Sequence, residues 1–224
     1  MYKFLSYPLD PEDLCWPGEP VLRTRICTEI GEDSACMTGE SVLPDHFGTH
    51  FDAPAHFHKG ALKIAELPAE YFVHEKVLLL DVPKRPEEGV MPEDLKPQEE
   101  AIKGCTLLLL RTGFFQVKRK DPKVYQCQGP FLHPDTCEYL VKTFPGLRTV
   151  GFDFLSVGSP CNDLSAQAHQ MLLGCHTEHY ITAVEDMDLS AIGDRAIRQV
   201  TIAPLRVVGM DSGQVCVIGD LEDC

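Results

Sequence analysis

Residues 46–58 read HFGTHFDAPAHFH and hold four of the nine histidines in the 224-residue chain. Nine histidines spread evenly along the chain would put fewer than one in a window of this size. Neutral imidazole nitrogens and a carboxylate such as Asp52 bind Zn²⁺ and related divalent cations at about 2.0–2.2 Å. The segment therefore predicts a divalent-metal site with nitrogen and oxygen ligands.

The spacing within this segment indicates how the chain must run. Alternate residues lie on one face of an extended chain, and here they are His46, Gly48, His50, Asp52, Pro54 and His56. Four extended residues span about 13 Å, which is too far for His46 and His50 to share one ion. We therefore expect a bend at Gly48, which has the most conformational freedom. Asp52 is two positions from His50 and can reach the same ion.

His56 is expected to have a separate role. Pro54 stiffens the chain after Asp52 and displaces His56 by one or two residue lengths. This displacement suits His56 to a second ion or to proton transfer. Two other interpretations are chance clustering and a purely structural metal site. Structural zinc usually has four protein ligands that include thiolates, and no cysteine lies closer to the motif than Cys36. A site with nitrogen and oxygen ligands, in which some coordination positions of the metal stay open for substrate or water, is therefore favoured.

The rest of the chain predicts an α/β or α+β fold in one domain, with more strands than helices. Continuous apolar runs indicate strands buried on both faces, at 77–82, 106–110, 149–154, 200–203 with Val207 and Val208, and 215–218. Helices are predicted at 134–143 and 164–174, the second with Asp163 as N-cap and Gly174 as stop. The polar interval 84–103 predicts a surface excursion with a short helix from Pro92.

Composition excludes several classes of protein. The formal net charge of −14 opposes non-specific binding to nucleic acid or anionic membrane surfaces. The longest basic run, at 118–120, is too short for that role and is expected to be a solvated turn. No apolar stretch reaches the roughly 18 residues that span a bilayer, and the first 30 residues are too acidic for a signal peptide. We expect a cytoplasmic protein that binds neither nucleic acid nor membrane.

The ten cysteines and the remaining histidines are expected to be ordinary residues. The cysteines are scattered from Cys15 to Cys224 without a CxxC pair, so most are interpreted as small buried apolar residues. His74 and His133 have no histidine at ligand spacing and are expected to be surface residues or hydrogen-bonded ones. Arg111 could bind a substrate carboxylate, but on a buried strand it more often forms a structural ion pair.

The run HFGTHFDAPAHF resembles the signature HxGTHxDxPxH(F) of the metal-dependent cyclase family, which includes bacterial kynurenine formamidases (arylformamidases) and isatin hydrolases. Other segments follow the order of this family: 5–9, 16–20, 109–113, 151–153, 168–169 and 185–189. The resemblance covers nearly the whole chain, and the histidine motif is its most specific part. It implies a single α/β domain over residues 1–224, with a strand-rich mixed core of the swivelling β/β/α type.

The resemblance also implies a set of site residues. The implied metal ligands are His46, His50, Asp52, His56, His169 and Glu185, with Asp52 and Glu185 able to bridge two ions. His56 either ligates the second metal or acts as a general acid and base. Trp16 matches an aromatic residue that lines the substrate pocket in the formamidases. The implied cofactor is Zn or Mn, two ions per chain.

One departure from the family concerns the downstream ligands. His169 and Glu185 are sixteen positions apart, farther than in the formamidases, and CHTEH at 175–179 occupies the extra length. The insertion can lengthen a loop, His176 or His179 can replace His169 as ligand, or Glu178 can reshape the pocket. We favour the loop, because a helix framed by Asp163 and Gly174 would hold His169 rigidly.

These residues predict a metal-dependent hydrolase that cleaves the C–N bond of a small amide or cyclic amide. A divalent ion would activate water and polarise the carbonyl, while His56 moves the proton to the departing nitrogen. An aromatic substrate would stack on Trp16 and on neighbouring aromatic side chains such as Phe57, and N-formylkynurenine of tryptophan catabolism is the first candidate. The alternatives are a metal-dependent cyclase, dehydratase or lactone hydrolase, or a non-catalytic metal-binding protein. The resemblance further implies a homodimer or larger homo-oligomer.

Overall fold

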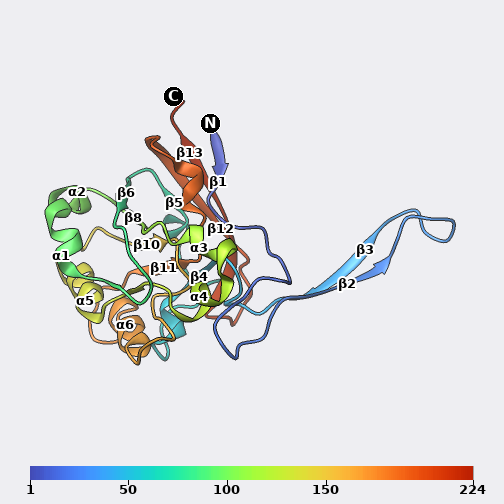
Figure 1. Cartoon of the computed structure of the whole chain (residues 1–224), viewed down its shortest axis with the longest axis horizontal. Coiled ribbons are helices and arrows are strands. Elements are labelled where there is room, and N and C mark those ends of the chain that lie inside the picture. The colour runs from blue at the N-terminus through green and yellow to red at the C-terminus, as the bar shows by residue number, and fades with distance from the viewer. Residues whose placement is uncertain (224) are drawn as a thin grey trace.

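The computed structural model describes residues 1–223, and its central feature is a nine-stranded mixed sheet (Figure 1). The strands of this sheet are β1 Tyr2–Phe4, β4 His50–Asp52, β5 Val73–His74, β6 Val77–Asp81, β8 Leu107–Arg111, β10 Thr149–Phe152, β11 Thr182–Glu185, β12 Ile197–Pro204 and β13 Ser212–Leu221. Their order is β5-β12-β13-β4-β11-β10-β8-β6, and β1 pairs with β13. The sheet curls so far that β12 contacts β6, which makes it nearly closed.

The sheet has a parallel part and an antiparallel part. Strands β6, β8, β10 and β11 are parallel, whereas β4, β13 and β12 follow as antiparallel neighbours. Helices cover one face of the parallel part: α1 Pro92–Leu95, α2 Glu99–Lys103, α5 Pro134–Thr143 and α6 Ser165–Leu172 (Figure 1). Helices α3 Phe115–Lys120 and α4 Pro122–Cys127 form a pair beside the sheet, and β7 Gly89–Val90 pairs with β9 Phe131–Leu132. Four short 3₁₀ helices complete the structure: η1 Pro54–His56, η2 Ala69–Tyr71, η3 Lys96–Gln98 and η4 Leu189–Ile192.

Side chains of the central strands point alternately to the two faces of the sheet, and the interior is divided into two hydrophobic cores. Leu108 and Leu110 of β8 pack with the helices, whereas Leu107 and Leu109 face the antiparallel strands β12 and β13. Successive side chains of a strand point to opposite faces, so each central strand contributes to both cores. All five predicted apolar runs contain strands, and burial on both faces is confirmed for 107–110 and 149–152, whereas β6 is only partly buried and β12 alternates between buried and more exposed residues. The mixed α/β class is confirmed.

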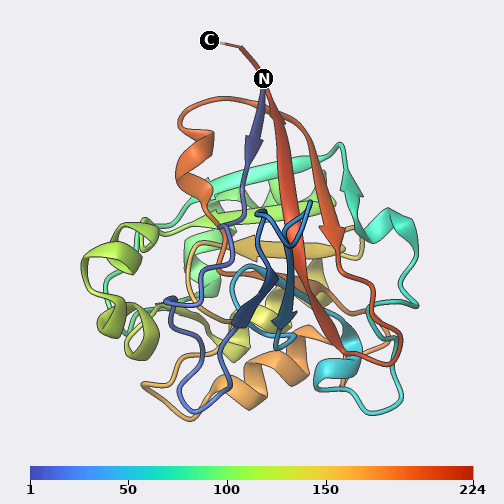
Figure 2. The ribbon, with the colours of Figure 1, turned by 90° about the vertical axis from the view of Figure 1, so that its right-hand side faces the viewer.

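A long hairpin projects from this body (Figures 1 and 2). It consists of β2 Arg23–Thr28 and β3 Thr38–Val42, and every residue of both strands is exposed. The apolar side chains of Ile26, Ile30 and Met37 are more than half exposed. No pattern in the sequence predicts this arm, because its strands lack a buried face and therefore lack the alternation of apolar and polar residues that marks a half-buried strand.

The predicted elements agree with the structure except at a few positions. The helix at 134–143 is α5, with identical bounds, and the short helix from Pro92 is α1. The helix at 164–174 is shorter, because α6 begins at Ser165. Asp163 is not its N-cap; instead the Asn162 side chain accepts a hydrogen bond from the backbone N–H of Leu164. Gly174 has a φ of +80° just after the helix, which confirms it as the stop.

Two further expectations were wrong. Strand β12 ends at Pro204, and Val207 and Val208 lie exposed in the following turn. Only three of the nine cysteines within residues 1–223 are buried, namely Cys15, Cys105 and Cys137. The others show that a scattered cysteine pattern does not by itself indicate burial. All nine are unpaired thiols.

The basic run 118–120 is not a solvated turn. It ends helix α3, and Lys118 is buried with its Nζ 2.5 Å from Asp186 Oδ2. The other carboxylate oxygen of Asp186 accepts a hydrogen bond from the Tyr125 hydroxyl at 2.6 Å. The backbone carbonyl of Asp186 accepts a bond from the Thr49 hydroxyl, also at 2.6 Å. This buried ion pair therefore connects α3 and α4 to the segment that precedes His50.

His74 in β5 is fully buried and hydrogen-bonded at both ring nitrogens. Its Nε2–H donates to the carbonyl oxygen of Tyr71 at 3.1 Å, and its Nδ1 lies 3.1 Å from Thr106 Oγ1. The expectation of a hydrogen-bonded, non-ligand histidine is confirmed. Burial lowers the pKa of His74 to about 4.

This buried histidine predicts a loss of stability in acid. Between about pH 6.5 and pH 4 the unfolded chain binds a proton at His74 and the folded chain does not, so the free energy of unfolding falls as the pH falls. The full contribution is on the order of 3 kcal/mol. His74→Gln should reduce the difference between unfolding free energies measured in urea at pH 7 and pH 4.5. The exposed control His176→Gln should keep the wild-type difference, and equal pH dependence in both variants would refute the assignment.

Candidate metal centre

Strand β4 carries the centre of the histidine motif and lies in the middle of the sheet. His50 pairs with Glu185 of β11 on one side and with Gln214 of β13 on the other. Asp52 pairs with Ala183 and Ser212 in the same way. All three residues of β4 are buried. The backbone of the site is therefore fixed by sheet hydrogen bonds on both edges.

Gly48 makes the bend that the spacing predicts. Its φ of +67° lies in the left-handed region, and a Cβ atom there would lie only 2.6 Å from Leu9 Cδ2. The turn brings the His46 ring to a centroid distance of 5.0 Å from the His50 ring. His46 Nδ1 lies 3.1 Å from Asp52 Oδ1. An extended chain would have separated these side chains, so the bend assembles this half of the site.

His56, at the other end of the motif, also lies close to His46. Pro54 begins the 3₁₀ helix η1, which ends at His56. The His56 ring centroid lies 4.0 Å from that of His46 and 5.5 Å from that of His169. His56 therefore lies between His46, which comes from the turn before β4, and His169, which comes from α6.

His169 and Glu185 join the motif from distant parts of the chain. His169 projects from α6 with its Nε2 3.6 Å from Glu185 Oε1, and Glu185 Oε2 lies 3.3 Å from His50 Nε2. His176 and His179 do not line the cavity described below. The structure thus brings His169, and neither alternative histidine, to Glu185, as expected if residues 175–179 only lengthen a loop.

Hydrogen bonds fix the tautomers of two histidines. His50 Nδ1–H donates to the Gly48 carbonyl at 2.8 Å, and His169 Nδ1–H donates to the Ser165 carbonyl at 2.8 Å. In each neutral ring this leaves the lone pair on Nε2, the atom that points toward Glu185. Bonds of this kind orient metal-binding histidines in many proteins.

The polar atoms at the centre of the site fit a cation. His50 Nε2 and both carboxylate oxygens of Asp52 are buried without a hydrogen-bond partner. The ligand atoms of His50, Asp52 and Glu185 lie within 4.8 Å of one another, and those of His46, Asp52 and His56 do so as well. Buried acceptors facing one another are costly unless a positive charge lies between them. Asp52 belongs to both groups, so the arrangement suits one ion or two ions that share this carboxylate.

The pKa shifts of Glu185 and His46 also indicate that positive charge is favourable at the centre of the site. Burial raises the pKa of Glu185, but its contacts with the His169 and His50 rings outweigh this and hold its pKa well below the usual range. Burial lowers the pKa of His46, but its contacts with the carboxylates of Asp211 and Asp52 raise that pKa to about 11. In the metal-free chain, protons on histidines therefore supply the positive charge that the carboxylates require. A divalent cation would replace these protons.

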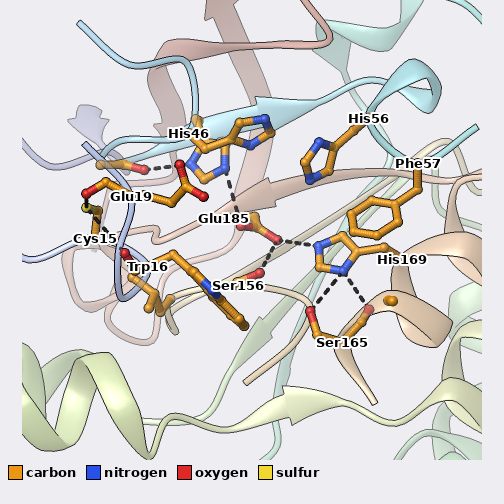
Figure 3. Close-up of a pocket in the computed structure, with 14 residues that line it drawn as sticks. Cys15, Trp16, Glu19, His46, His56, Phe57, Ser156, Ser165, His169 and Glu185 are labelled. Atoms are coloured by element: carbon orange, nitrogen blue, oxygen red, sulfur yellow. Dashed lines mark hydrogen bonds and ion pairs between the residues drawn. The ribbon is translucent and has the colours of Figure 1, made fainter. Parts of the chain in front are cut away.

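The residues open onto a cavity of about 360 Å³ (Figure 3). Its lining combines the histidines and Glu185 with the apolar side chains of Trp16, Phe57 and Leu155. Trp16 and Phe57 contribute aromatic surface, and the Phe57 ring stacks on that of His169 at a centroid distance of 4.5 Å. The remaining lining residues are Cys15, Glu19, Gly48, Ser156, Ser165 and Ala166. None of the residues that line this cavity is a lysine or an arginine.

Arg111 and His133 lie elsewhere. Arg111 Nε is 2.5 Å from Asp81 Oδ1 and its Nη2 is 2.8 Å from Asp81 Oδ2, so the expected structural ion pair is confirmed. The His133 side chain caps α5 by accepting a bond from the backbone N–H of Asp135.

Sequence reasoning missed two acidic residues at the site. Glu19 lines the cavity beside Trp16, and Asp211 contacts the rings of His46 and His56. Bonds from these two histidines lower the pKa of Asp211. Glu19 lies in the segment 16–20, of which only Trp16 was assigned to the pocket, and nothing in the sequence connects Asp211 to His56, 155 positions earlier.

Comparison with known proteins identifies a family. The family model described as Cyclase matches residues 4–159, more than half of the chain. A Haemophilus influenzae protein of uncharacterized function is 40% identical over 128 residues, which are 57% of this chain and 90% of that protein. The kynurenine formamidase of Bacillus cereus is 28% identical over 211 residues, 94% of this chain and 93% of that enzyme.

Solved structures show the same fold. Isatin hydrolase A from Labrenzia aggregata, bound to benzyl benzoate, superposes with a TM-score of 0.80 at 20% identity and covers 98% of this chain and 93% of its own. A structure described as a potential metal-dependent hydrolase with cyclase activity gives a TM-score of 0.72 at 19% identity, over 100% of this chain and 99% of its own. Within residues 1–223, none of the helices has both the length and the hydropathy of a membrane span. The family match and the curated relatives show that the chain belongs to the cyclase family.

Proposed function

We propose that this chain is a metal-dependent hydrolase that cleaves the C–N bond of a small aromatic amide or cyclic amide. The observation that carries the proposal is the set of unpaired polar atoms on His50 and Asp52, which face Glu185 at the base of a partly aromatic cavity. Relatives named kynurenine formamidase and neighbours named isatin hydrolase support an amide hydrolase.

The proposed ligands are His46, His50, Asp52, His169 and Glu185, with room for one or two divalent ions, Zn or Mn, and His56 either ligates a second ion or acts as general acid and base. Such an ion, when bound, lowers the pKa of water and polarises a carbonyl oxygen. The residues of the chain provide the charge and the fixed geometry that the ion needs. Asp52 and Glu185 provide negative charge, and Ser165 and Gly48 fix the rings of His169 and His50.

We assign proton transfer to His56. Its side chain is about a fifth exposed, whereas His50 and His169 are nearly fully buried. His46 is similarly exposed, but its Nδ1 contacts the proposed ligand Asp52, so we assign proton exchange with substrate to His56. As general base it would accept a proton from the attacking water, and as general acid it would return that proton to the departing nitrogen. If His56 instead ligates a second ion, its loss would reduce the metal content.

The cavity indicates the substrate class. Trp16 and Phe57 offer aromatic faces on which a planar ring can stack, an interaction worth about 1 kcal/mol beyond burial. A volume of about 360 Å³ accommodates a single substituted aromatic ring. N-formylkynurenine and isatin are the substrates to test first.

We also propose that the chain functions as a homodimer or larger homo-oligomer. An isolated two-stranded hairpin is marginally stable in water, and the arm formed by β2 and β3 has no buried residue in either strand. A second copy that covers the arm would give it the contacts it lacks. Sedimentation equilibrium of the full chain tests this point.

One experiment tests the catalytic proposal. Protein from which a chelator has removed the metal should lose amide hydrolysis, and added Zn²⁺ or Mn²⁺ should restore it. His56→Ala should lower kcat by about 10²–10⁴-fold, the usual contribution of a general acid and base, and should keep the wild-type metal content. The control His58→Ala removes a neighbouring histidine that does not line the cavity and should leave kcat unchanged. Full turnover by His56→Ala would exclude the assigned role.

A further inference from the structure

Asp211 lies next to the histidine motif although it is far from it in sequence. It immediately precedes β13, and its backbone carbonyl accepts a hydrogen bond from the N–H of Ala53 at 3.0 Å. The neighbouring Ser212 hydroxyl donates to the carbonyl of Asp45 at 2.8 Å. These bonds tie the segment to residues on both sides of β4, so the position of Asp211 is set by the same sheet that holds His50 and Asp52.

One oxygen of Asp211 contacts two imidazole rings. Oδ2 lies 2.8 Å from His56 Nδ1 and 3.3 Å from His46 Nε2. A carboxylate only accepts hydrogen bonds, so each contact requires a proton on the histidine nitrogen. In neutral His56 a proton on Nδ1 leaves the lone pair on Nε2.

We propose that Asp211 is a positioning residue, which holds His56 in the Nδ1–H tautomer and so leaves Nε2 as the nitrogen that accepts the proton during hydrolysis. The inference rests on the proposed function, because it assigns a partner to the proposed general acid and base. A neutral histidine free in water exchanges between tautomers and rotates, whereas a carboxylate partner fixes both the proton and the plane of the ring.

The contact with His46 gives this arrangement a second consequence. The His46 and His56 rings lie 4.0 Å apart at their centroids with an angle of 35° between their planes. Since Asp211 Oδ2 bonds both rings, Asp211 also fixes the position of His56, the proposed general acid and base, relative to His46, a proposed metal ligand. Asp211 could instead be a ligand itself, because its oxygen lies near ligand atoms of Asp45 and His46. The metal content of a variant distinguishes these two roles.

The test combines Asp211→Asn and His56→Ala in a double-mutant cycle on the metal-loaded protein. Loss of an outer partner of this kind typically costs 10–100-fold in activity. We expect Asp211→Asn to lower kcat 10–100-fold, with KM within about 3-fold of wild type and with unchanged metal per chain. In the His56→Ala background the same substitution should have no further effect on kcat, because the group through which it acts is gone.

A matched control comes from another carboxylate and histidine pair. Asp135 Oδ2 lies 3.4 Å from His133 Nδ1 at the surface, outside the cavity. Asp135→Asn should leave kcat, KM and metal content unchanged. Equal losses of kcat with and without His56 would overturn the inference, and so would a fall in metal per chain in Asp211→Asn.

A second readout does not depend on activity. The ¹⁵N shifts of the histidine side chains in the metal-free protein report which nitrogen carries the proton. Wild type should show His56 protonated at Nδ1, and Asp211→Asn should show a mixture of tautomers. If the ¹⁵N spectrum of His56 is the same in Asp211→Asn as in wild type, the positioning role is refuted, whether or not the wild-type protein hydrolyses any of the amides. If Asp211→Asn shows a mixture of His56 tautomers but the wild-type protein hydrolyses none of the amides, only the proposed function is refuted.

Discussion

Asp52→Asn is expected to abolish metal binding and to lower kcat/KM for amide hydrolysis by about 10³-fold or more. Asp52 belongs to both groups of potential ligand atoms, and its two oxygens are buried without hydrogen-bond partners. A bound ion supplies several kcal/mol of transition-state charge stabilisation, and about 4 kcal/mol corresponds to a factor of 10³. Elemental analysis and steady-state kinetics measure the two effects.

Asp153→Asn is the matched control for this prediction. Asp153 is also fully buried, but its oxygens accept hydrogen bonds from Thr112 and Gly113, and it does not line the cavity. Its substitution should lower thermal stability and leave the metal content at the wild-type value. Metal retained at wild-type level in Asp52→Asn would contradict the proposed ligand set.

Asp186→Asn is expected to lower the free energy of unfolding by about 3 kcal/mol, because it leaves buried Lys118 with only the more distant and partly exposed carboxylate of Asp13, 3.8 Å away. Asparagine tolerates the positive φ of 54° at this position, so the effect reports the charge and not the backbone. Urea unfolding at pH 7 measures it. The double variant Lys118→Met with Asp186→Asn should recover much of the loss, since it removes both charges.

The exposed pair of Arg111 and Asp81 provides the comparison. Asp81 is largely exposed, and exposed ion pairs are worth about 1 kcal/mol or less. Asp81→Asn should therefore cost far less stability than Asp186→Asn. Similar losses in the two variants would show that burial does not decide the strength of the Lys118 contact.

The fold class and most of the candidate site were predictable from the sequence for one physical reason. A short continuous apolar run bounded by turn residues, such as 107–110, favours a strand buried on both faces, and a bend is required if His46 and His50 are to meet. Both inferences depend on local geometry. The helix at 134–143 was equally predictable, since Pro134 marks its start and its apolar positions repeat at helical spacing.

The parts that were missed depend on contacts between distant segments. Strand β11 is short, and Thr182 and Glu185 interrupt its apolar pattern because one pairs with Thr149 and the other faces the site. Asp211 gains its importance only when β13 pairs with β4. The burial of Lys118 likewise follows from tertiary contact with Asp186, which no local pattern reveals.

Strand β4 lies in the middle of the sheet, between β11 and β13, and its backbone pairs with both neighbours at His50 and Asp52. Small zinc domains differ, since in them the binding free energy of the ion is the free energy of folding. We therefore expect that a chelator would remove the proposed ion from this protein without unfolding the sheet, so that the same chain could bind metal again without refolding.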